Sequence, residues 1–247
     1  MADRPGMKRV AILQSCYIPW KGYFDLINSV DEFILYDDCQ YTRQDWRNRN
    51  RVKTANGTRW LTIPVQVEGL YSQRLNETVI ADPTWGPRHW DILRQAYRKA
   101  ACFERYAEGI EETYAACTSE RLLSKINRRF LETVCGLLGI ETSLTWSTDY
   151  GVSGERLERT ERVVSLCKQA GASVYVTGPR ARGYIDEALF EAAAIELRYV
   201  DYEGYPEYPQ LHPPFEHRVT ILDLLFNAGP DAHSFMKSFR PQVLSRG

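Results

Sequence analysis

Two adjacent carboxylates are the first residues in the chain whose types and positions suggest catalysis. Asp37 and Asp38 directly follow a short apolar segment, residues 33–36, at the end of a predicted strand. Neighbouring carboxylates repel each other unless a metal, an amine or an arginine lies nearby. The sequence supplies cations, because five arginine or lysine residues occur between residues 43 and 53. We therefore expect Asp37 or Asp38 to orient or deprotonate an amine as a general base.

The basic segment itself is the first predicted binding site, since arginine and asparagine alternate in it directly after a tryptophan. In an extended segment this alternation places arginines on one side and asparagines on the other. Guanidinium groups suit a phosphate or diphosphate, and an indole can stack on a base or cover a sugar face. A solvent-exposed loop paired with local acids is the alternative. The predicted substrate-binding residues are Trp46, Arg47, Asn48, Arg49, Asn50 and Arg51.

A second candidate site is the loop between the first predicted strand and the first predicted helix, residues 14–23. Gly22 would stand at the start of that helix, where free N–H groups face an anion. The alternative is a Pro-Gly turn whose aromatic residues cap the core. The candidate substrate-binding residues are Gln14, Pro19, Trp20 and Gly22, and the additional candidate catalytic residues are Tyr17 and Tyr23.

A third candidate site lies between a later predicted strand and helix, at residues 177–183. Gly178 allows close backbone approach, and Arg180 and Arg182 add positive charge at a helix N-terminus. The segment fits neither a Walker nor a GxGxxG template, and an ordinary turn between strand and helix is the alternative. We take Thr177, Gly178 and Arg180 as candidate substrate-binding residues.

Several other classes of site find no support in the sequence. The four histidines have no metal-ligand spacing, so we predict no metal site, and the residues imply no particular cofactor. The six cysteines form no C-x-x-C pair, which disfavours a zinc ribbon and a disulfide framework, and we expect Cys16 to be a buried free thiol. No G-x-S-x-G motif marks a nucleophile.

Charge and hydropathy restrict the expected partners and location. The net charge is -1 at pH 7, so the molecule as a whole has no electrostatic reason to bind nucleic acid or an anionic membrane. The apolar runs are shorter than a membrane-spanning helix requires, and the first residues lack the apolar segment of a signal peptide. We expect a cytoplasmic protein that binds a phosphorylated small molecule and does not insert into a membrane.

The order of predicted elements indicates how these residues are positioned. Residues 10–13 and 33–36 read as strands on either side of a helix, which forms a βαβ unit and implies a parallel sheet. Residues 39–58 read as a polar loop, and residues 60–65 read as a third strand that Pro64 places near an edge. The α/β pattern returns with a helix over 155–170, a strand over 174–176, a helix from 184 and a strand over 195–200.

Helical periodicity dominates the middle and the end of the chain. Residues 88–138 show two apolar helical faces, with Ser119 as the predicted cap of the second helix and Gly139 as its end. A final helix is predicted over 220–227, with Thr220 and Asp223 as a capping pair. The predicted fold is therefore α/β, a Rossmann-like parallel sheet in a single domain over 1–247, with a helical insertion at 88–138.

With these residues in place, the sequence resembles the WbqC-like protein family over nearly its whole length. The matching segments are Gln14-x-x-Tyr17-x-Pro19-Trp20-x-Gly22-Tyr23-Phe24, Tyr36-Asp37-Asp38-x-Gln40-Tyr41, Trp46-Arg47-Asn48-Arg49-Asn50, Trp60-Leu61-Thr62-x-Pro64, Thr177-Gly178-Pro179, Tyr208-x-Gln210 and Ile221-Leu222-Asp223-x-Leu225-Phe226-Asn227. After Gln14 the resemblance leads us to expect Pro-Asn or a similar pair, and this sequence has Ser15-Cys16 instead. The resemblance adds Gln210 to the candidate substrate-binding residues.

The resemblance implies a role in bacterial surface-polysaccharide or natural-product biosynthesis, with acyl or aminoacyl transfer to an amino sugar. The turn over residues 19–23 also resembles, more distantly, the Pro-His-x-Gly-His turn of nucleotidyltransferases, with Trp20 and Tyr23 in place of the histidines. Neither residue can carry the positive charge of a histidine. An ATP-dependent ligase that forms an adenylate and a non-catalytic ligand-binding subunit are therefore the alternative functions.

Overall fold

The computed structural model describes residues 6–152 and 157–239, and its centre is a sheet of five parallel strands. The strand order is β5-β2-β1-β6-β7, which places the first strand in the middle and confirms the predicted Rossmann-like α/β class. The strands are β1 (Arg9–Leu13), β2 (Glu32–Leu35), β5 (Ser143–Trp146), β6 (Val174–Thr177) and β7 (Glu196–Tyr199).

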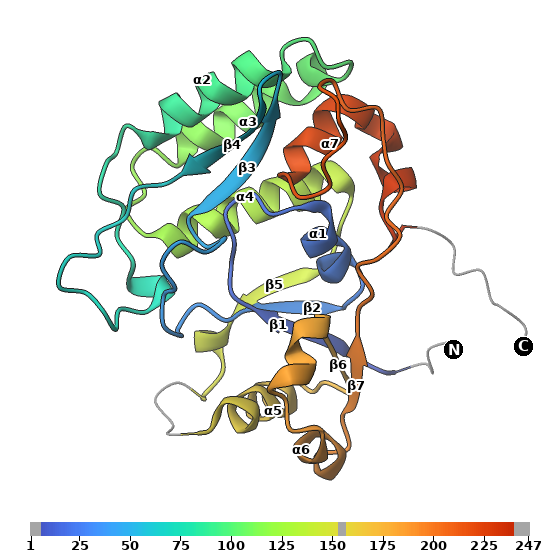
Figure 1. Ribbon diagram of the computed structural model, residues 1–247. Coiled ribbons are helices and arrows are strands. Elements are labelled where there is room, and N and C mark those ends of the chain that lie inside the picture. Colours follow the sequence, from blue (N-terminus) through green and yellow to red (C-terminus); the bar gives the residue numbers. More distant parts are fainter. Residues whose placement is uncertain (1–5, 153–156, 240–247) are drawn as a thin grey trace, which may run out of the picture.

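Helices cover both faces of the sheet because alternate residues of the central strands are apolar in both directions. In β1, Ala11 packs on one side, whereas Val10 and Ile12 pack on the other. In Figure 1, α1 (Lys21–Asn28) and α4 (Leu123–Leu138) lie above the sheet, and α5 (Arg159–Gln169) and α6 (Glu187–Ala192) lie below it. The predicted helix over 155–170 begins at Arg159 in the structure, and residues 155–156 lie outside the described residues.

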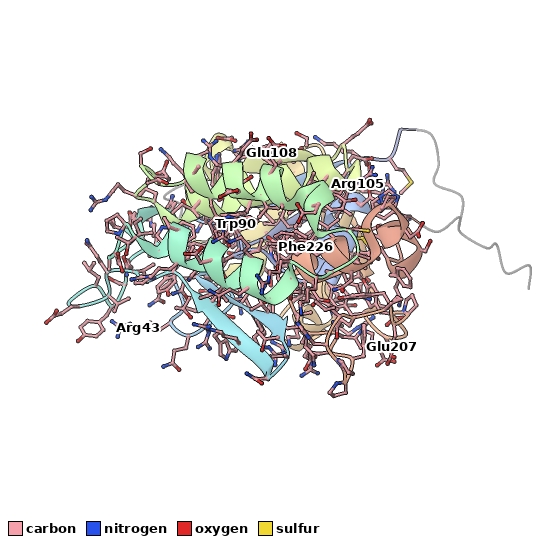
Figure 2. The ribbon with its side chains drawn as sticks, turned by 90° about the horizontal axis from the view of Figure 1, so that it is seen from above. Arg43, Trp90, Arg105, Glu108, Glu207 and Phe226 are labelled. Carbon is pink, nitrogen blue, oxygen red and sulfur yellow. The ribbon has the colours of Figure 1, made fainter. Side chains whose placement is uncertain are left out.

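The predicted helical region contains three helices where the apolar faces had suggested two. These are α2 (Trp85–Tyr97), α3 (Phe103–Ala116) and α4. The prediction that Ser119 caps the last of them is wrong, because the N-cap is Leu122 and the Glu120 carboxylate accepts the Arg121 and Leu122 amides. Gly139 ends α4 in the left-handed conformation with φ 66°, as predicted. The Trp90 ring on α2 stacks on Phe103 of α3, which in turn contacts Phe226 (Figure 2).

A separate antiparallel hairpin corrects the prediction for residues 39–65. It consists of β3 (Arg49–Thr54) and β4 (Gly57–Thr62), so the later part of the predicted polar loop forms strand, and Pro64 lies beyond the second strand. The alternation in β3 is that of a half-buried strand, since Asn50 and Val52 are buried. The Asn56-Gly57 turn signal is confirmed at the hairpin tip, where Gly57 has φ 97°.

The last helix, α7 (Ile221–Ala228), is capped by Thr220, whose hydroxyl accepts the Leu222 amide at 3.3 Å. The predicted capping role of Asp223 is wrong, because its carboxylate is fully buried and accepts hydrogen bonds from Tyr97 and Tyr208 at 2.9 and 2.7 Å. The 3-10 helices are η1 (Leu75–Glu77), η2 (Ser147–Asp149), η3 (Pro179–Gly183) and η4 (Gly229–Phe235). Within the described ranges, the helices are all too short or too polar to cross a lipid bilayer.

Candidate active site

A cleft of about 580 Å³ lies at the carboxyl ends of β2 and β5, where parallel sheets usually bind ligands. The segments that follow these two strands line one side of the cleft, and α4 lines the other. η1 contributes Asn76. Besides Asn76, the polar residues that line the cleft include Asp37, Asp38, Ser147, Ser124, Lys125, Arg128, Arg129 and Glu132.

Asp37, predicted as catalytic, is buried at the wall of this cleft, and only one of its two carboxylate oxygens is hydrogen-bonded. Oδ1 accepts the Ser15 amide at 2.7 Å, and the Ser15 hydroxyl adds a second hydrogen bond to the carboxylate. Oδ2 is buried and has no hydrogen-bond partner among the described residues. Burial raises the pKa of Asp37 to about 6, although the Ser15 hydrogen bonds and the charge of Arg47 lower it.

Asp38, the second predicted catalytic residue, has both oxygens occupied. The Ser147 hydroxyl donates to Oδ1 at 2.6 Å, and the guanidinium of Arg162 on α5 pairs with Oδ2. Arg162 also lies over the Tyr36 ring, 5.0 Å from its centroid. The positive charge that pairs with Asp38 therefore comes from a residue 124 positions later in the chain. The sequence had suggested the adjacent basic segment as its source. With its carboxylate already paired, Asp38 is less suited to accept a proton than Asp37.

The cations that line the cleft come from α4. Arg128 pairs with Glu132 at 2.7 Å and lies over Trp146, 5.1 Å from the ring centroid. Lys125 and Arg129 form no ion pair with any residue that the structure describes. The sequence analysis did not select these residues. Their spacing, one turn apart on the polar side of an amphipathic helix, was the available signal.

The arginines of the predicted phosphate site do not line this cleft. Arg47 lies beneath the first loop and donates to the Cys16 sulfur at 2.9 Å. The Arg49 guanidinium lies 4.4 Å from the Trp60 ring centroid, and Arg51 lies 4.0 Å from the Glu216 carboxylate. Figure 2 shows Arg43, at the start of this basic segment, at the periphery of the molecule. Arg51 also lies 5.7 Å from the Trp60 centroid, so Arg49 and Arg51 share one indole on the hairpin, whereas Arg47 is directed to the first loop.

The other residues of that segment divide between the interior and the surface. Asn48 donates to the Ile63 carbonyl at 2.8 Å, and Asn50 donates to the Tyr17 and Ile18 carbonyls at 3.1 and 2.7 Å. Both asparagines are buried and fasten the hairpin to the first loop and the segment after β4. Trp46 is exposed beside Trp60, with 5.3 Å between the ring centroids.

The tyrosines of the first loop are buried in the protein interior. The Tyr17 hydroxyl lies 2.9 Å from His89 Nδ1 and 2.6 Å from the Tyr114 hydroxyl, away from the cleft. The Tyr23 hydroxyl donates to the Gln14 carbonyl at 2.9 Å. Burial raises the pKa values of both tyrosines well above their usual range. Neither hydroxyl is placed to exchange a proton with a ligand in the cleft.

The rest of the first loop is packed in the same way. Gln14 donates to the Cys39 sulfur at 2.6 Å, and the Pro19 carbonyl accepts the Ile221 amide at 2.9 Å. The Trp20 ring lies across the start of α1, so a Cβ on Gly22 would be 2.3 Å from that ring. The glycine is required there by the packing of Trp20. The loop therefore matches the alternative of a turn whose aromatic residues cap the core.

The third predicted loop and Gln210 lie outside the cleft. Thr177 is buried, and its hydroxyl accepts from the Tyr175 hydroxyl at 3.3 Å. Gly178 follows it at the end of β6, and Arg180 is exposed to solvent. Gln210 donates to Asp223 at 2.8 Å and to the Glu216 carbonyl at 3.0 Å, so its amide holds the segment before α7.

The described residues contain no group of three or more histidine, cysteine, aspartate or glutamate side chains that could hold a metal ion. All six cysteines are free, and Cys16 is buried with its pKa raised by burial. The chemistry that the cleft can support is proton transfer at Asp37 next to a cationic helix face.

The comparisons with known proteins agree with the order of the motifs. An uncharacterized protein of Mycobacterium tuberculosis, Rv1507c, is 48% identical over 234 residues, which cover 95% of this chain and all of that protein. No solved structure matches the chain. The WbqC-like protein family matches residues 14–235, which include both aspartates, the hairpin and α4. The chain is therefore a member of the WbqC-like protein family.

Proposed function

We propose that this protein transfers an acyl or aminoacyl group to the amine of a phosphorylated or nucleotide-linked amino sugar, in surface-polysaccharide or natural-product biosynthesis. The observation that carries the proposal is the unpaired Oδ2 of Asp37, a buried carboxylate oxygen at the wall of a cleft with a cationic face. The family resemblance supports the choice of an amino sugar as the acceptor.

Asp37 supplies the base that such a transfer needs. With a pKa of about 6, the carboxylate is ionised at neutral pH and is still basic enough to hold a proton. The acceptor binds as an ammonium and first loses one proton to solvent. The neutral nitrogen then attacks the carbonyl carbon of an activated acyl donor, and Asp37 Oδ2 takes the second proton that the nitrogen loses. The bond from the carbonyl carbon to the leaving group breaks, and the proton passes from Asp37 to that group. The products are the amide and the protonated leaving group.

The α4 cations supply the binding energy for the phosphate. Lys125 and Arg129 have no carboxylate partner among the described residues, so a phosphate that reaches them displaces no ion pair. Arg128 is held by Glu132 and by the Leu144 carbonyl at 3.0 Å, which gives the cleft a fixed charged wall. In this proposal α4 replaces the hairpin arginines as the phosphate-binding element.

The ligase alternative has less support from the first loop. Lys21 donates to the Pro206 carbonyl at 3.0 Å, and the Trp20 ring covers the helix start that would receive a triphosphate. The ligand-binding alternative differs from a transferase only in the absence of turnover. A direct assay of product formation therefore separates it from the transferase.

Binding is tested first, by thermal shift and calorimetry with UDP- and dTDP-linked amino sugars, ATP and coenzyme A. A ligand that binds the native state alone raises the melting temperature, so a hit reports a site in the folded protein. We expect a nucleotide-sugar hit that Lys125→Ala and Arg129→Ala each weaken about tenfold. Arg49→Ala on the hairpin is the matched control and should bind as the native protein does. The reverse pattern would restore the hairpin as the phosphate site.

Turnover is tested by incubating the protein with the bound amino sugar and acyl or aminoacyl donors, with mass spectrometry of the product. We expect Asp37→Asn to lower the rate of amide formation at least about a hundredfold, a larger factor than the accompanying loss of ligand affinity. Tight binding without product from the native protein, across thioester, ester and adenylate donors, would favour a ligand-binding subunit. ATP-dependent release of AMP would favour the ligase.

A further inference from the structure

The cleft contains two buried hydrogen-bond acceptors that have no donor among the residues that the structure describes. One is Asp37 Oδ2, and the other is Oδ1 of Asn76 on η1, which lines the same cleft. Buried polar atoms in folded proteins are almost always paired, so two unpaired acceptors in one cleft require an explanation. A ligand whose groups donate hydrogen bonds to both oxygens would explain why they are unpaired in the protein alone.

Backbone hydrogen bonds fix the two acceptors relative to each other. The Asn76 amide donates to the Asp37 carbonyl at 2.8 Å, and the neighbouring Leu75 amide donates to the Cys39 carbonyl at 2.9 Å. η1 is thereby fastened along the segment that follows β2. Asn76 and Asp37 are therefore hydrogen-bonded neighbours in the backbone, and both residues line the cleft.

The number of donors that a ligand group carries decides which group fits. A hydroxyl has one O–H donor and can satisfy one of the two oxygens, whereas an ammonium has three N–H donors and can satisfy both. A hydroxyl in this position would leave one buried acceptor unpaired, and sites of that kind reject the analogue that lacks a donor. The carboxylate also favours a cation over a neutral group.

We propose that Asn76 determines the acceptor specificity of the cleft, by binding the amino group of the substrate together with Asp37 and thereby excluding a hydroxyl in its place. This inference rests on the proposed function and assigns the residue that selects its amine over a hydroxyl. The ligand is oriented along the cleft, with its amine at Asp37 and Asn76 and its phosphate at Lys125 and Arg129 of α4.

The test compares glucosamine 1-phosphate with glucose 1-phosphate, which differ only by an amino group in place of a hydroxyl, and measures both dissociation constants by calorimetry at pH 7. We expect the native protein to bind the amine at least about tenfold more tightly, as one hydrogen bond to a charged group implies. Asn76→Leu, which keeps the side-chain size and removes the acceptor, should reduce that preference to less than about threefold. Asn76→Asp, which keeps an acceptor, should retain it.

Lys125→Ala is the matched control, because it should weaken both probes by the same factor and leave the preference unchanged. Circular dichroism of each variant establishes that it is folded. Equal binding of the two probes by the native protein, a preference that survives in Asn76→Leu, or failure to bind either probe would overturn the inference. Failure of the proposed function looks different: the amine preference persists and depends on Asn76, but no amide forms with any donor.

Discussion

Ser15 holds Asp37 through two groups, since its amide donates to Oδ1 at 2.7 Å and its hydroxyl forms a second hydrogen bond to the same carboxylate. Asn127 on α4 in turn donates to the Ser15 hydroxyl at 3.0 Å. Asn127 therefore holds the Ser15 side chain beside Asp37. The orientation of the proposed base is therefore set from the opposite wall of the cleft.

Removal of the Ser15 hydroxyl should make Asp37 more basic. The hydrogen bond favours the charged carboxylate, so its loss in Ser15→Ala raises the pKa of Asp37 above about 6. We expect the acid limb of the pH profile of kcat/KM to move upward by about half a unit to one unit. Ser124→Ala is the matched control, since Ser124 is a buried serine of the same cleft that forms no hydrogen bond to Asp37. A limb that stays in place in Ser15→Ala would mean that Asp37 is not the titrating base.

Asp37 should lower the stability of the folded protein at neutral pH. Its pKa rises from 3.8 to about 6 on folding, so the folded state binds the proton more tightly than the unfolded state does. The stability contribution of this carboxyl is therefore greatest below pH 4, falls as the pH rises through 4 to 6, and is then constant. A shift of about 2 units corresponds to about 3 kcal/mol at neutral pH.

Asp37→Asn removes that charge, so we expect the variant to melt several degrees above the native protein at pH 7.5. The difference should shrink as the pH is lowered to 4, because the native carboxyl is then protonated. Thermal unfolding at several pH values measures the effect. Asp91→Asn, on the exposed Asp91–Arg94 pair, is the control and should show little dependence on pH. A variant less stable than the native protein at pH 7.5 would contradict this account of Asp37.

The pair between Arg162 and Asp38 should contribute strongly to stability. The Asp38 side chain is 2% exposed, so Arg162→Ala leaves a buried carboxylate with only the Ser147 hydroxyl as a partner. We expect a loss of about 3 kcal/mol in the free energy of unfolding at pH 7, measured with urea. Arg94→Ala, which removes an exposed arginine paired at 3.0 Å, should cost less than about 1 kcal/mol. Equal costs for the two variants would show that Asp38 is solvated in solution.

Gly22 should matter for packing and not for ligand binding. A Cβ at this position would lie 2.3 Å from the Trp20 ring, so we expect Gly22→Ala to destabilise the protein by about 1–3 kcal/mol while ligand affinity stays unchanged. Gly109→Ala is the matched control, because no atom lies within 4 Å of the added carbon in α3 and the substitution should stabilise the helix. If the folded Gly22→Ala variant bound the ligand more weakly than the native protein, the start of α1 would again be a candidate anion site.

The parts of the fold that follow local rules were predictable from the sequence. The parallel α/β class followed from the βαβ unit, and Asp37 was selected because it follows a predicted strand, where the structure has a cleft. The Arg-Asn alternation correctly predicted an extended segment. The phosphate-binding role predicted for the same segment does not match the geometry. Asn50 binds the backbone of the first loop, and Arg49 stacks on Trp60.

The contacts that complete the cleft depend on tertiary structure. Arg162 meets Asp38 across 124 residues of sequence, and Asn127 meets Ser15 across 112. No local pattern encodes such a pairing, since both partners are ordinary polar residues within their own elements. The α4 cations were visible in the sequence as the polar face of a helix, but only the fold places that face opposite Asp37.

The position of α4 also affects how this family can be engineered. One side of the helix contributes Ile126, Phe130 and Val134 to the hydrophobic core, while Lys125 and Arg129 line the cleft. Asn127 also donates to the Arg47 carbonyl at 2.9 Å. A chimera that exchanged the helices between two relatives would replace the cationic wall of the cleft and the support of the proposed base together. Under the proposed function, an exchange of α4 therefore changes ligand binding and core packing together. A graft of this helix has to include the first loop that matches it.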